Sequence, residues 1–336
     1  MILVTGASGM LGSQILLHAA QSGEKSLRGI YRSSRSLDNV KLSFSVQGAL
    51  DKFNSIEWVK ADLLDPIETD EAISGAKYII HCAALVSPNT SDSDTMIDIN
   101  PQISENVWSS GFRNNIIHGV HVSSISTFSY NPNENFINEE SETKTENLSS
   151  YGKSKWASEL IAWRFIAEGL SISVVSPSVI LGCPAWNQGS SLILKRIKKG
   201  MPFYPPGSTG WVDVRDVADF TLKNISTRIS GERFILNGYN ASFKKTFSDI
   251  AVELNCNPPK WKTSYTILIF ASIIESFYSK LSTYKQKLSH DSIRTVTSSV
   301  KYDATKSKLS GFQYRQWEET ISALAKYCEL LMVKNN

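Results

Sequence analysis

Short apolar runs recur along the first half of the chain, and polar turns and residues with helical spacing separate them. These runs predict five strands, at residues 2–4, 26–31, 56–59, 78–84 and 119–125. Helical spacing follows the first strand through Ile15, Leu16 and Ala19 and recurs near residues 67–74. Because strands and helices alternate, the chain is expected to form an α/β fold with a doubly wound parallel sheet.

The turn after the first strand carries glycines at positions 6, 9 and 12. Glycines at this spacing let the backbone turn tightly, let a pyrophosphate approach closely and let the new helix pack against the strand. The phosphates would lie at the helix N-terminus, where unpaired N–H groups favour negative charge. We therefore expect dinucleotide binding rather than a purely structural turn, with contacts from Gly6, Ser8, Gly9, Met10, Leu11 and Gly12.

The ends of the next strands indicate which cofactor fits. No acidic residue follows the second strand to bind ribose hydroxyls, and Arg32 and Arg35 stand there instead. Guanidinium groups suit a 2′-phosphate, so NADP is favoured over NAD, with solvated surface arginines as the alternative. After the third strand Asp62 and Leu63 are expected to border the adenine. The small Ala83 and Ala84 that end the fourth would leave room for the cofactor.

Tyr151 and Lys155 stand four residues apart, so on a helix they share a face. A neighbouring cation favours the phenolate and lowers the pKa of a tyrosine, which then serves as a general acid or base. A surface tyrosine beside a lysine on an ordinary helix has the same pattern. Ser123 and Ser124 end the fifth strand, at the edge of the sheet that faces a ligand. The polar, acidic stretch 131–150 is expected to be a surface loop without chemistry, and His81 a core residue.

Composition narrows the class of protein. The 336 residues include 35 basic and 32 acidic ones, a net charge of +3, and no long basic run, so nucleic acid is not an expected partner. The four cysteines form no Cys-x-x-Cys pair, and no metal site is expected. Without a secretion signal at the N-terminus, a cytoplasmic location is expected. The apolar stretch 265–278 predicts a packed helix, with a helix lying on a membrane surface as the alternative.

These motifs together resemble the extended short-chain dehydrogenase/reductase family, also called the NAD-dependent epimerase/dehydratase family. Within it they look most like the dihydroflavonol reductase and 3-beta-hydroxysteroid dehydrogenase branch. The resemblance rests on the glycine loop, Asp62-Leu63, residues 81–84, Asn100, Ser123-Ser124, Tyr151 with Lys155, and residues 176–182, 211–218, 302–306 and 309–312. It implies a Rossmann fold, a possible homodimer, and catalytic roles for Ser124, Tyr151, Lys155 and Asn100.

Other assignments follow the resemblance. Asn100-Pro101 is expected to open a helix, although Ile103-Ser104 replaces the Gly-Thr pair that usually follows the asparagine. Ser123, Tyr151 and Lys155, with Pro177, Val179 and Ile180, are expected to contact the cofactor. A dinucleotide-binding domain would span residues 1–175. Residues 176–336 would form a smaller substrate-binding lobe, with chain crossings back and an apolar pocket near Trp186, Phe203, Tyr204 and Trp211. Asp213 and Asp216 would cap or brace a helix.

The expected reaction is hydride transfer between NADPH and a small-molecule carbonyl or alcohol substrate, with Tyr151 as the proton donor and Ser124 bonded to the carbonyl oxygen. Two alternatives stay open. A nucleotide-sugar epimerase or dehydratase would hold NAD tightly. A redox-inactive NADP-sensing protein would bind the cofactor without turnover, although the complete Ser124, Tyr151 and Lys155 set argues against it.

Overall fold

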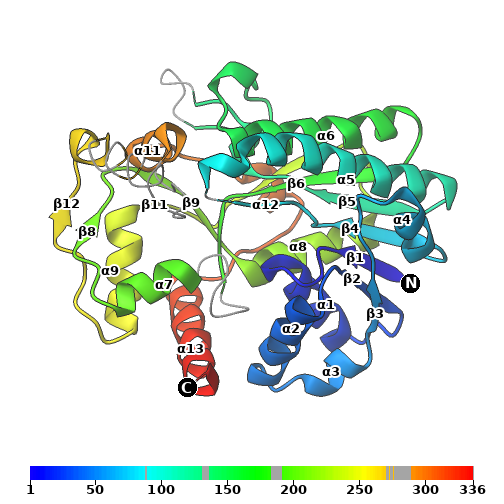
Figure 1. The fold of residues 1–336 in the computed structure, drawn as a ribbon, viewed down its shortest axis with the longest axis horizontal. Coiled ribbons are helices and arrows are strands. Elements are labelled where there is room, and N and C mark those ends of the chain that lie inside the picture. Colours follow the sequence, from blue (N-terminus) through cyan, green and yellow to red (C-terminus); the bar gives the residue numbers. More distant parts are fainter. Residues whose placement is uncertain are drawn as a thin grey trace.

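The computed structural model describes residues 1–87, 89–130, 136–182, 191–269 and 289–335, together with Ser272 and Glu275. Within them a parallel seven-stranded sheet has the order β10-β6-β5-β4-β1-β2-β3 (Figure 1). This arrangement confirms the expected doubly wound fold. The strands are β1 Ile2–Thr5, β2 Leu27–Tyr31, β3 Glu57–Lys60, β4 Tyr78–His81, β5 His118–Val122, β6 Ile172–Pro177 and β10 Arg233–Leu236.

Helices cover both faces of this sheet, and each face has its own buried apolar cluster. Ile15 and Leu16 of α1 and Phe220 of α8 belong to the first cluster. Trp108 of α5 and Phe165 of α6 belong to the second. On one face lie α1 Met10–Gln21, α2 Ser34–Val46, α3 Leu50–Asn54 and α8 Val214–Thr227; on the other lie α4 Pro66–Ile73, α5 Ser93–Arg113 and α6 Ser150–Ala167.

A second group of elements, drawn on the left of Figure 1, comes from the C-terminal half of the chain. Its three-stranded sheet has the order β11-β9-β7, and β8 pairs with β12. One buried cluster that includes Leu194, Phe247 and Leu324 joins its helices. The elements are β7 Val179–Leu181, α7 Ser191–Lys198, β8 Phe203–Tyr204, β9 Ser208–Asp213, β11 Tyr239–Ser242, α9 Phe243–Glu253, β12 Trp261–Lys262, α11 His290–Thr297, α12 Thr305–Leu309 and α13 Trp317–Asn335.

Strand β10 and helix α8 follow residue 175, yet they pack in the seven-stranded sheet and against it. The chain therefore crosses between the two groups of elements more than once. The division into lobes at residue 175 stays a prediction.

The prediction that Asn100 and Pro101 open a helix is wrong. Helix α5 begins at Ser93, and Pro101 lies inside it, where a proline removes one backbone hydrogen bond. Met96 precedes Pro101 and Ile103 and Val107 follow it, and all three are buried. The apolar face of the helix therefore continues through the proline, and its packing offsets the lost hydrogen bond.

The acidic stretch before Tyr151 is less exposed than expected in its described part, residues 136–149. Ile137 is buried and pairs with Tyr302, and Leu148 is buried. The Glu139 carboxylate accepts a hydrogen bond from the Ile235 N–H at 2.7 Å. This part of the loop therefore attaches to the end of the sheet at β10.

Several aromatic side chains lie elsewhere than in an apolar pocket. Trp211 and Tyr204 are buried in the core of the C-terminal half, and Phe203 is 51% exposed. Trp186 lies outside the described residues. Of the stretch 265–278, residues 265–269 are helical, with Tyr265 47% and Ile267 60% exposed and residues 268–269 half-buried, and most of the remainder lies outside the described residues, so its packing stays a prediction. None of the helices in the described ranges is long and apolar enough to cross a membrane.

Candidate active site

The residues expected to hold a cofactor gather at one edge of the main sheet. The six parallel strands β1 to β6 all point their carboxyl ends toward that edge, where ligands bind in folds of this type. The residues that follow the strands there are the glycine loop after β1, Arg32 after β2, Asp62 and Leu63 after β3, Ala83 and Ala84 after β4, Ser123 after β5, and Val179 and Ile180 after β6. Pro177 ends β6 itself.

The glycine loop has the geometry of a phosphate cradle. A Cβ on Gly12 would lie 2.4 Å from the Gly6 carbonyl oxygen, so this glycine is required by the packing of the loop against itself. A Cβ on Gly9 would meet only that same oxygen within 4 Å, at 3.2 Å. Gly9 caps α1 without a side-chain hydrogen bond. The first N–H groups of α1 thus have no side-chain acceptor from the cap, and the loop fits a dinucleotide pyrophosphate.

Ser124 and Tyr151 lie together, as the sequence predicts. Ser124 follows β5, and its hydroxyl accepts a hydrogen bond from the Ser126 N–H at 3.1 Å. Tyr151 lies in the first turn of α6, whose N-cap is Ser149. A Cβ on Gly152 would lie 2.3 Å from the Ser126 carbonyl oxygen, so only glycine lets α6 approach the Ser124 loop this closely. A hydrogen bond joins the side chains of Tyr151 and Ser124.

The expected lowering of the Tyr151 pKa by Lys155 is not found. Burial raises the pKa of Tyr151 above its ordinary value, and the hydrogen bond with Ser124 opposes that rise. The Lys155 ammonium is held elsewhere, because its Nζ donates to the Val122 carbonyl oxygen at 2.7 Å. In this arrangement Ser124, rather than Lys155, is the group that favours the phenolate.

Lys155 is only 4% exposed, and burial lowers its pKa to about 8. Two titratable groups lie near it, His81 at the end of β4 and Cys82, which directly follows that strand. Burial raises the pKa of the Cys82 thiol to about 12, and burial together with the Lys155 charge lowers the pKa of His81 to about 3. His81 is hydrogen bonded to Thr5 at 2.8 Å and Ser104 at 3.0 Å, as expected for a core histidine.

Asn100 contributes to the site through its neighbours. Its side-chain oxygen accepts from the Leu85 N–H at 2.6 Å, and its amide nitrogen donates to the Leu85 carbonyl oxygen at 3.0 Å. The same nitrogen donates to the Ser154 hydroxyl at 3.1 Å. Asn100 therefore ties the loop after β4 to α6, between the positions of Tyr151 and Lys155. Its expected role in catalysis stays a prediction.

A buried ion pair beneath the site was not predicted. Glu159, one helical turn beyond Lys155, is completely buried, and its Oε1 lies 3.1 Å from Nε of Arg233 on β10. Glu159 Oε2 accepts from the Ser123 hydroxyl at 2.5 Å, and Arg233 Nη2 donates to the Thr127 hydroxyl at 2.5 Å. The pair therefore holds both ends of the loop that carries Ser124. The one sign of this ion pair in the sequence is the arginine that begins the otherwise apolar run 233–236.

Arg32 and Arg35 lie between the carboxyl end of β2 and the first turn of α2. Both side chains are exposed and, within the described residues, make no hydrogen bond or ion pair. Between them Ser33 caps α2, with its hydroxyl accepting from the Ser36 N–H at 3.3 Å. Two guanidinium groups and a helix N-terminus thus share one short stretch of backbone.

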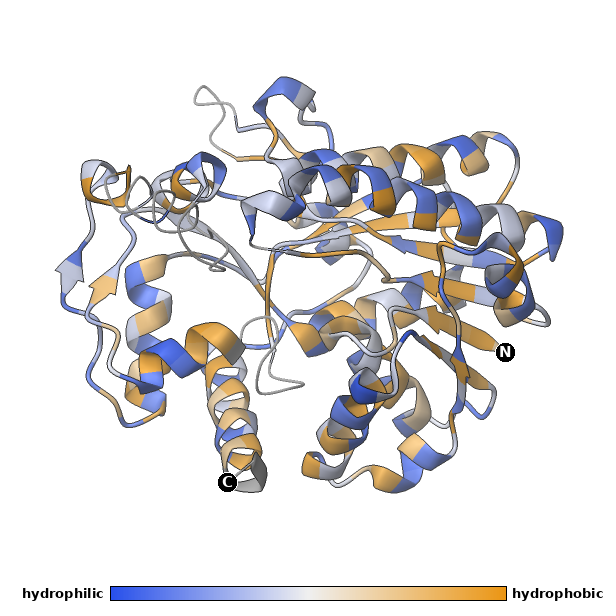
Figure 2. Ribbon diagram, in the orientation of Figure 1, coloured by the Kyte–Doolittle hydropathy of each residue, from blue (hydrophilic) through white to orange (hydrophobic). Residues whose placement is uncertain are grey.

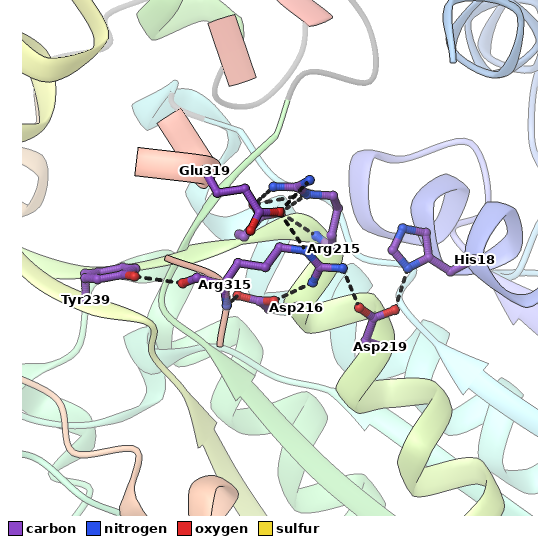
Figure 3. A network of polar contacts seen from close by, with 8 residues as sticks. His18, Arg215, Asp216, Asp219, Tyr239, Arg315 and Glu319 are labelled. Atoms are coloured by element: carbon purple, nitrogen blue, oxygen red, sulfur yellow. Dashed lines mark hydrogen bonds and ion pairs between the residues drawn. The ribbon is translucent and has the colours of Figure 1, made fainter. Parts of the chain in front are cut away.

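A second polar network lies at the start of α8 (Figure 3). Asp213 caps the helix by accepting from the Arg215 N–H at 2.8 Å, and Asp216 accepts from Arg315 Nη1 at 2.5 Å, so both acids cap or brace the helix as predicted. Arg315 also donates to Asp219 at 2.9 Å, and Asp219 contacts His18 of α1 at 2.6 Å.

Three features together define an NAD(P)-dependent enzyme of the short-chain dehydrogenase/reductase type. They are the doubly wound sheet, the glycine loop that opens α1, and the serine, tyrosine and lysine beside the central strands. The family model described as the NAD dependent epimerase/dehydratase family matches residues 2–236. The chain belongs to that family, which confirms the resemblance noted in its sequence.

Relatives within the family carry different names. Sterol demethylase protein B of Methylococcus capsulatus is 28% identical, with 70% of this chain and 69% of that protein covered. A putative dihydroflavonol 4-reductase of Synechocystis sp. is 25% identical over 90% of this chain and 87% of that protein. An N-acetyl-alpha-D-glucosaminyl-diphospho-ditrans,octacis-undecaprenol 4-epimerase of Escherichia coli O157:H7 is 22% identical over 93% and 89%.

Solved structures have the same fold over nearly the whole chain. The protein gox2253 superposes with a TM-score of 0.79 at 20% identity, covering 98% of both chains. The UDP-glucuronic acid 4-epimerase of Bacillus cereus, in complex with NAD, gives a TM-score of 0.74 at 15% identity, covering 98% of this chain and 99% of that one. At these identities the similarity shows the fold and leaves the reaction open.

Proposed function

We propose that this protein is an NADP-dependent oxidoreductase that reduces an aldehyde or ketone to an alcohol, or catalyses the reverse reaction. The observation that carries the proposal is the exposed pair Arg32 and Arg35 at the end of β2. In this fold the adenosine ribose lies beside that strand end, and guanidinium groups there match a 2′-phosphate. The N-terminus of α2 adds N–H groups that favour the same anion.

The chain offers contacts along the full length of such a cofactor. Asp62 and Leu63 border the adenine, the loop from Gly6 to Gly12 holds the pyrophosphate, and Ala83 and Ala84 leave space beside β4. Ser123, Pro177, Val179 and Ile180 lie at the ends of β5 and β6, toward the nicotinamide. A Cβ on Gly9 would meet no atom within 4 Å except the Gly6 carbonyl oxygen, which supports this fit.

In reduction, a bound nicotinamide would supply the hydride that the carbonyl carbon receives. Tyr151 donates its phenolic proton to the carbonyl oxygen, so that one hydride and one proton convert C=O to CH–OH. Ser124 donates a hydrogen bond to the same oxygen as negative charge develops. Lys155 would hold the ribose on the nicotinamide side, and the Ser124 hydroxyl favours the phenolate left on Tyr151. Ser124 already bonds Tyr151, which supports this pairing of roles.

Calorimetric titration of the full chain with NADPH and NADH tests the proposal, after extraction has shown whether any nucleotide co-purifies. We expect tighter binding of NADPH and loss of that preference in Arg32→Ser. Arg294→Ala is the matched control, because Arg294 is an exposed arginine on α11. Oxidation of NADPH by members of an aldehyde and ketone panel, followed by absorbance, then tests the reaction.

The rival function is an NAD-dependent nucleotide-sugar epimerase, like the UDP-glucuronic acid 4-epimerase of Bacillus cereus. The Escherichia coli relative is also a 4-epimerase by name, of a sugar linked through diphosphate to undecaprenol. Such an enzyme returns its hydride within one turnover and needs no external reductant. NAD bound through purification, together with NADPH affinity unchanged by Arg32→Ser, would overturn the proposal. If the chain binds NADPH, but no substrate oxidises the NADPH and no nucleotide sugar is interconverted, the protein is a sensor.

A further inference from the structure

The outer end of the C-terminal half exposes a cluster of large apolar side chains, which is uncommon on the surface of a globular protein. Strands β8 and β12 pair there, and Figure 1 shows them at the far side of this half from the main sheet. The rings of Phe203 and Trp261, 51% and 60% exposed, lie 5.6 Å apart. Tyr265 and Ile267 follow in the next turn of the chain, 47% and 60% exposed. We call these four residues the β8–β12 tip.

Lysines surround the tip in a definite geometry. Phe203 pairs with Trp261 and Tyr204 pairs with Lys262, so the aromatic pair points to one face of the two-stranded ribbon and Lys262 to the other. Tyr204 on that second face is buried, which makes it the face toward the protein body. Lys260 and Lys262 are exposed and make no ion pair with any described residue. Lys262 thus lies behind the aromatic rings, toward the protein, and Lys260 directly precedes β12.

We infer that the β8–β12 tip binds the surface of a membrane that contains anionic phospholipids. Tryptophan and tyrosine rings favour the boundary between headgroups and acyl chains, where one part of the ring is apolar and another is polar. Lysines one layer closer to the protein would then lie level with anionic headgroups, which attract them. Figure 2 shows β8 partly in the orange of apolar residues at this outermost edge.

Other occupants fit the tip less well. A second copy of the chain would add its own Lys260 and Lys262 to the same small contact, and like charges oppose that approach. The tip is also a ridge of side chains on a two-residue ribbon, which is small for a stable protein interface but sufficient for shallow insertion. The proposal is independent of the reaction that the enzyme catalyses.

Sedimentation of the full chain with vesicles tests the inference. We expect binding to vesicles of phosphatidylglycerol and phosphatidylcholine, little binding to phosphatidylcholine alone, and weakening by added salt. Trp261→Ser, and separately Lys260→Gln with Lys262→Gln, should each lower the partition coefficient about tenfold or more. The controls are Leu309→Ser, a leucine 82% exposed on α12, and Lys25→Gln with Lys41→Gln, two exposed lysines on the other half of the chain.

Two results would overturn the inference. One is that the chain, shown to be folded by its titration with NADPH or NADH, binds charged and neutral vesicles equally or binds neither. The other is self-association in analytical ultracentrifugation that Trp261→Ser abolishes while vesicles stay unbound, because the tip would then be an interface between copies. If the tip variants and the control variants reduced vesicle binding equally, the assignment of binding to the tip residues would also be contradicted.

Discussion

Burial disfavours the charged forms of both Tyr151 and Lys155, the two residues on which the proposed proton transfer depends. It raises the pKa of the phenol and lowers that of the ammonium to about 8. A neutral phenol is the form that donates a proton to a carbonyl oxygen, so the environment of Tyr151 suits the direction of reduction. The hydrogen bond with Ser124 keeps the phenolate accessible after the transfer.

The first prediction follows from that phenol. Tyr151→Phe removes the proton donor and keeps the ring, so we expect turnover to fall by about 10²-fold to 10⁴-fold. Cofactor affinity should change by less than about threefold, a free-energy change below 1 kcal/mol. Steady-state assays and calorimetry measure the two effects, and Tyr130→Phe, at an exposed tyrosine, is the control. Full activity of Tyr151→Phe would refute the role assigned to this residue.

A second prediction concerns stability between pH 8 and 10.5. The folded chain releases the Lys155 proton near pH 8, whereas the unfolded chain keeps it until about 10.5, the ordinary value for a lysine. The unfolded state binds more protons in that window, so Lys155 makes the free energy of unfolding rise with pH, by up to about 3 kcal/mol. Cys82 has the opposite effect from pH 9 upward, because its folded pKa of about 12 is raised.

Urea unfolding at several pH values, compared between the natural chain and Lys155→Met, isolates the lysine contribution. The variant should lack the rise, and its stability relative to the natural chain should be greatest at or below pH 8. Lys153→Met, at an exposed position on the same helix, is the control. Parallel pH profiles for the natural chain and Lys155→Met would contradict the prediction.

At the scale of elements, the Glu159–Arg233 pair joins α6 to β10 and holds the Ser124 loop between them. The guanidinium of Arg233 also lies 3.7 Å from the centre of the Phe128 ring. Removing one partner of a buried pair leaves an uncompensated charge, so Arg233→Met should lower the free energy of unfolding by about 3–5 kcal/mol.

The double variant Glu159→Gln with Arg233→Met should recover more than half of that loss, because the Glu159 carboxylate left without its guanidinium partner is then replaced by a neutral amide. Urea unfolding of the single and double variants forms a double-mutant cycle, and turnover measured alongside reports on the Ser124 loop. Arg164→Met is the control, since Arg164 forms an exposed pair with Glu105. Additive effects in the cycle would show that the two residues act separately.

A comparison of the predicted elements with those of the structure shows which features the sequence predicts well. The strands, the glycine loop and the Tyr151–Lys155 face depend on neighbours within a few residues, and all are found. The start of α5 depends on how Met96 and Ile103 pack against other elements, which overrides the local signal of Asn100-Pro101. The Glu159–Arg233 pair joins residues 74 positions apart, and local periodicity carries no information about such a contact.

At the scale of the whole molecule, Arg315 joins the two groups of elements (Figure 3). Its guanidinium bonds Asp216 and Asp219 of α8, its carbonyl oxygen accepts from the Tyr239 hydroxyl of β11 at 2.7 Å, and it stands just before α13. Asp216 is 1% exposed, and burial raises its pKa to about 6 although Arg315 opposes the rise. One side chain therefore neutralises a buried acid while fixing the start of the C-terminal helix.

Arg315→Met should therefore destabilise the protein in a pH-dependent way. Without the guanidinium, the pKa of Asp216 rises further above its ordinary value of 3.8, so the folded state keeps a proton that the unfolded state has released. A raised carboxyl pKa means stability that is lost as pH increases. The deficit relative to the natural chain should be about 2–4 kcal/mol at pH 8 and clearly smaller at pH 5. Urea unfolding at both values measures it, and limited proteolysis should cut the variant sooner near α13.

Adding Asp216→Asn should remove most of the pH dependence. A deficit that is equal at both values, or that grows at pH 5, would show that Arg315 acts by packing alone and that the charge on Asp216 is not what it balances.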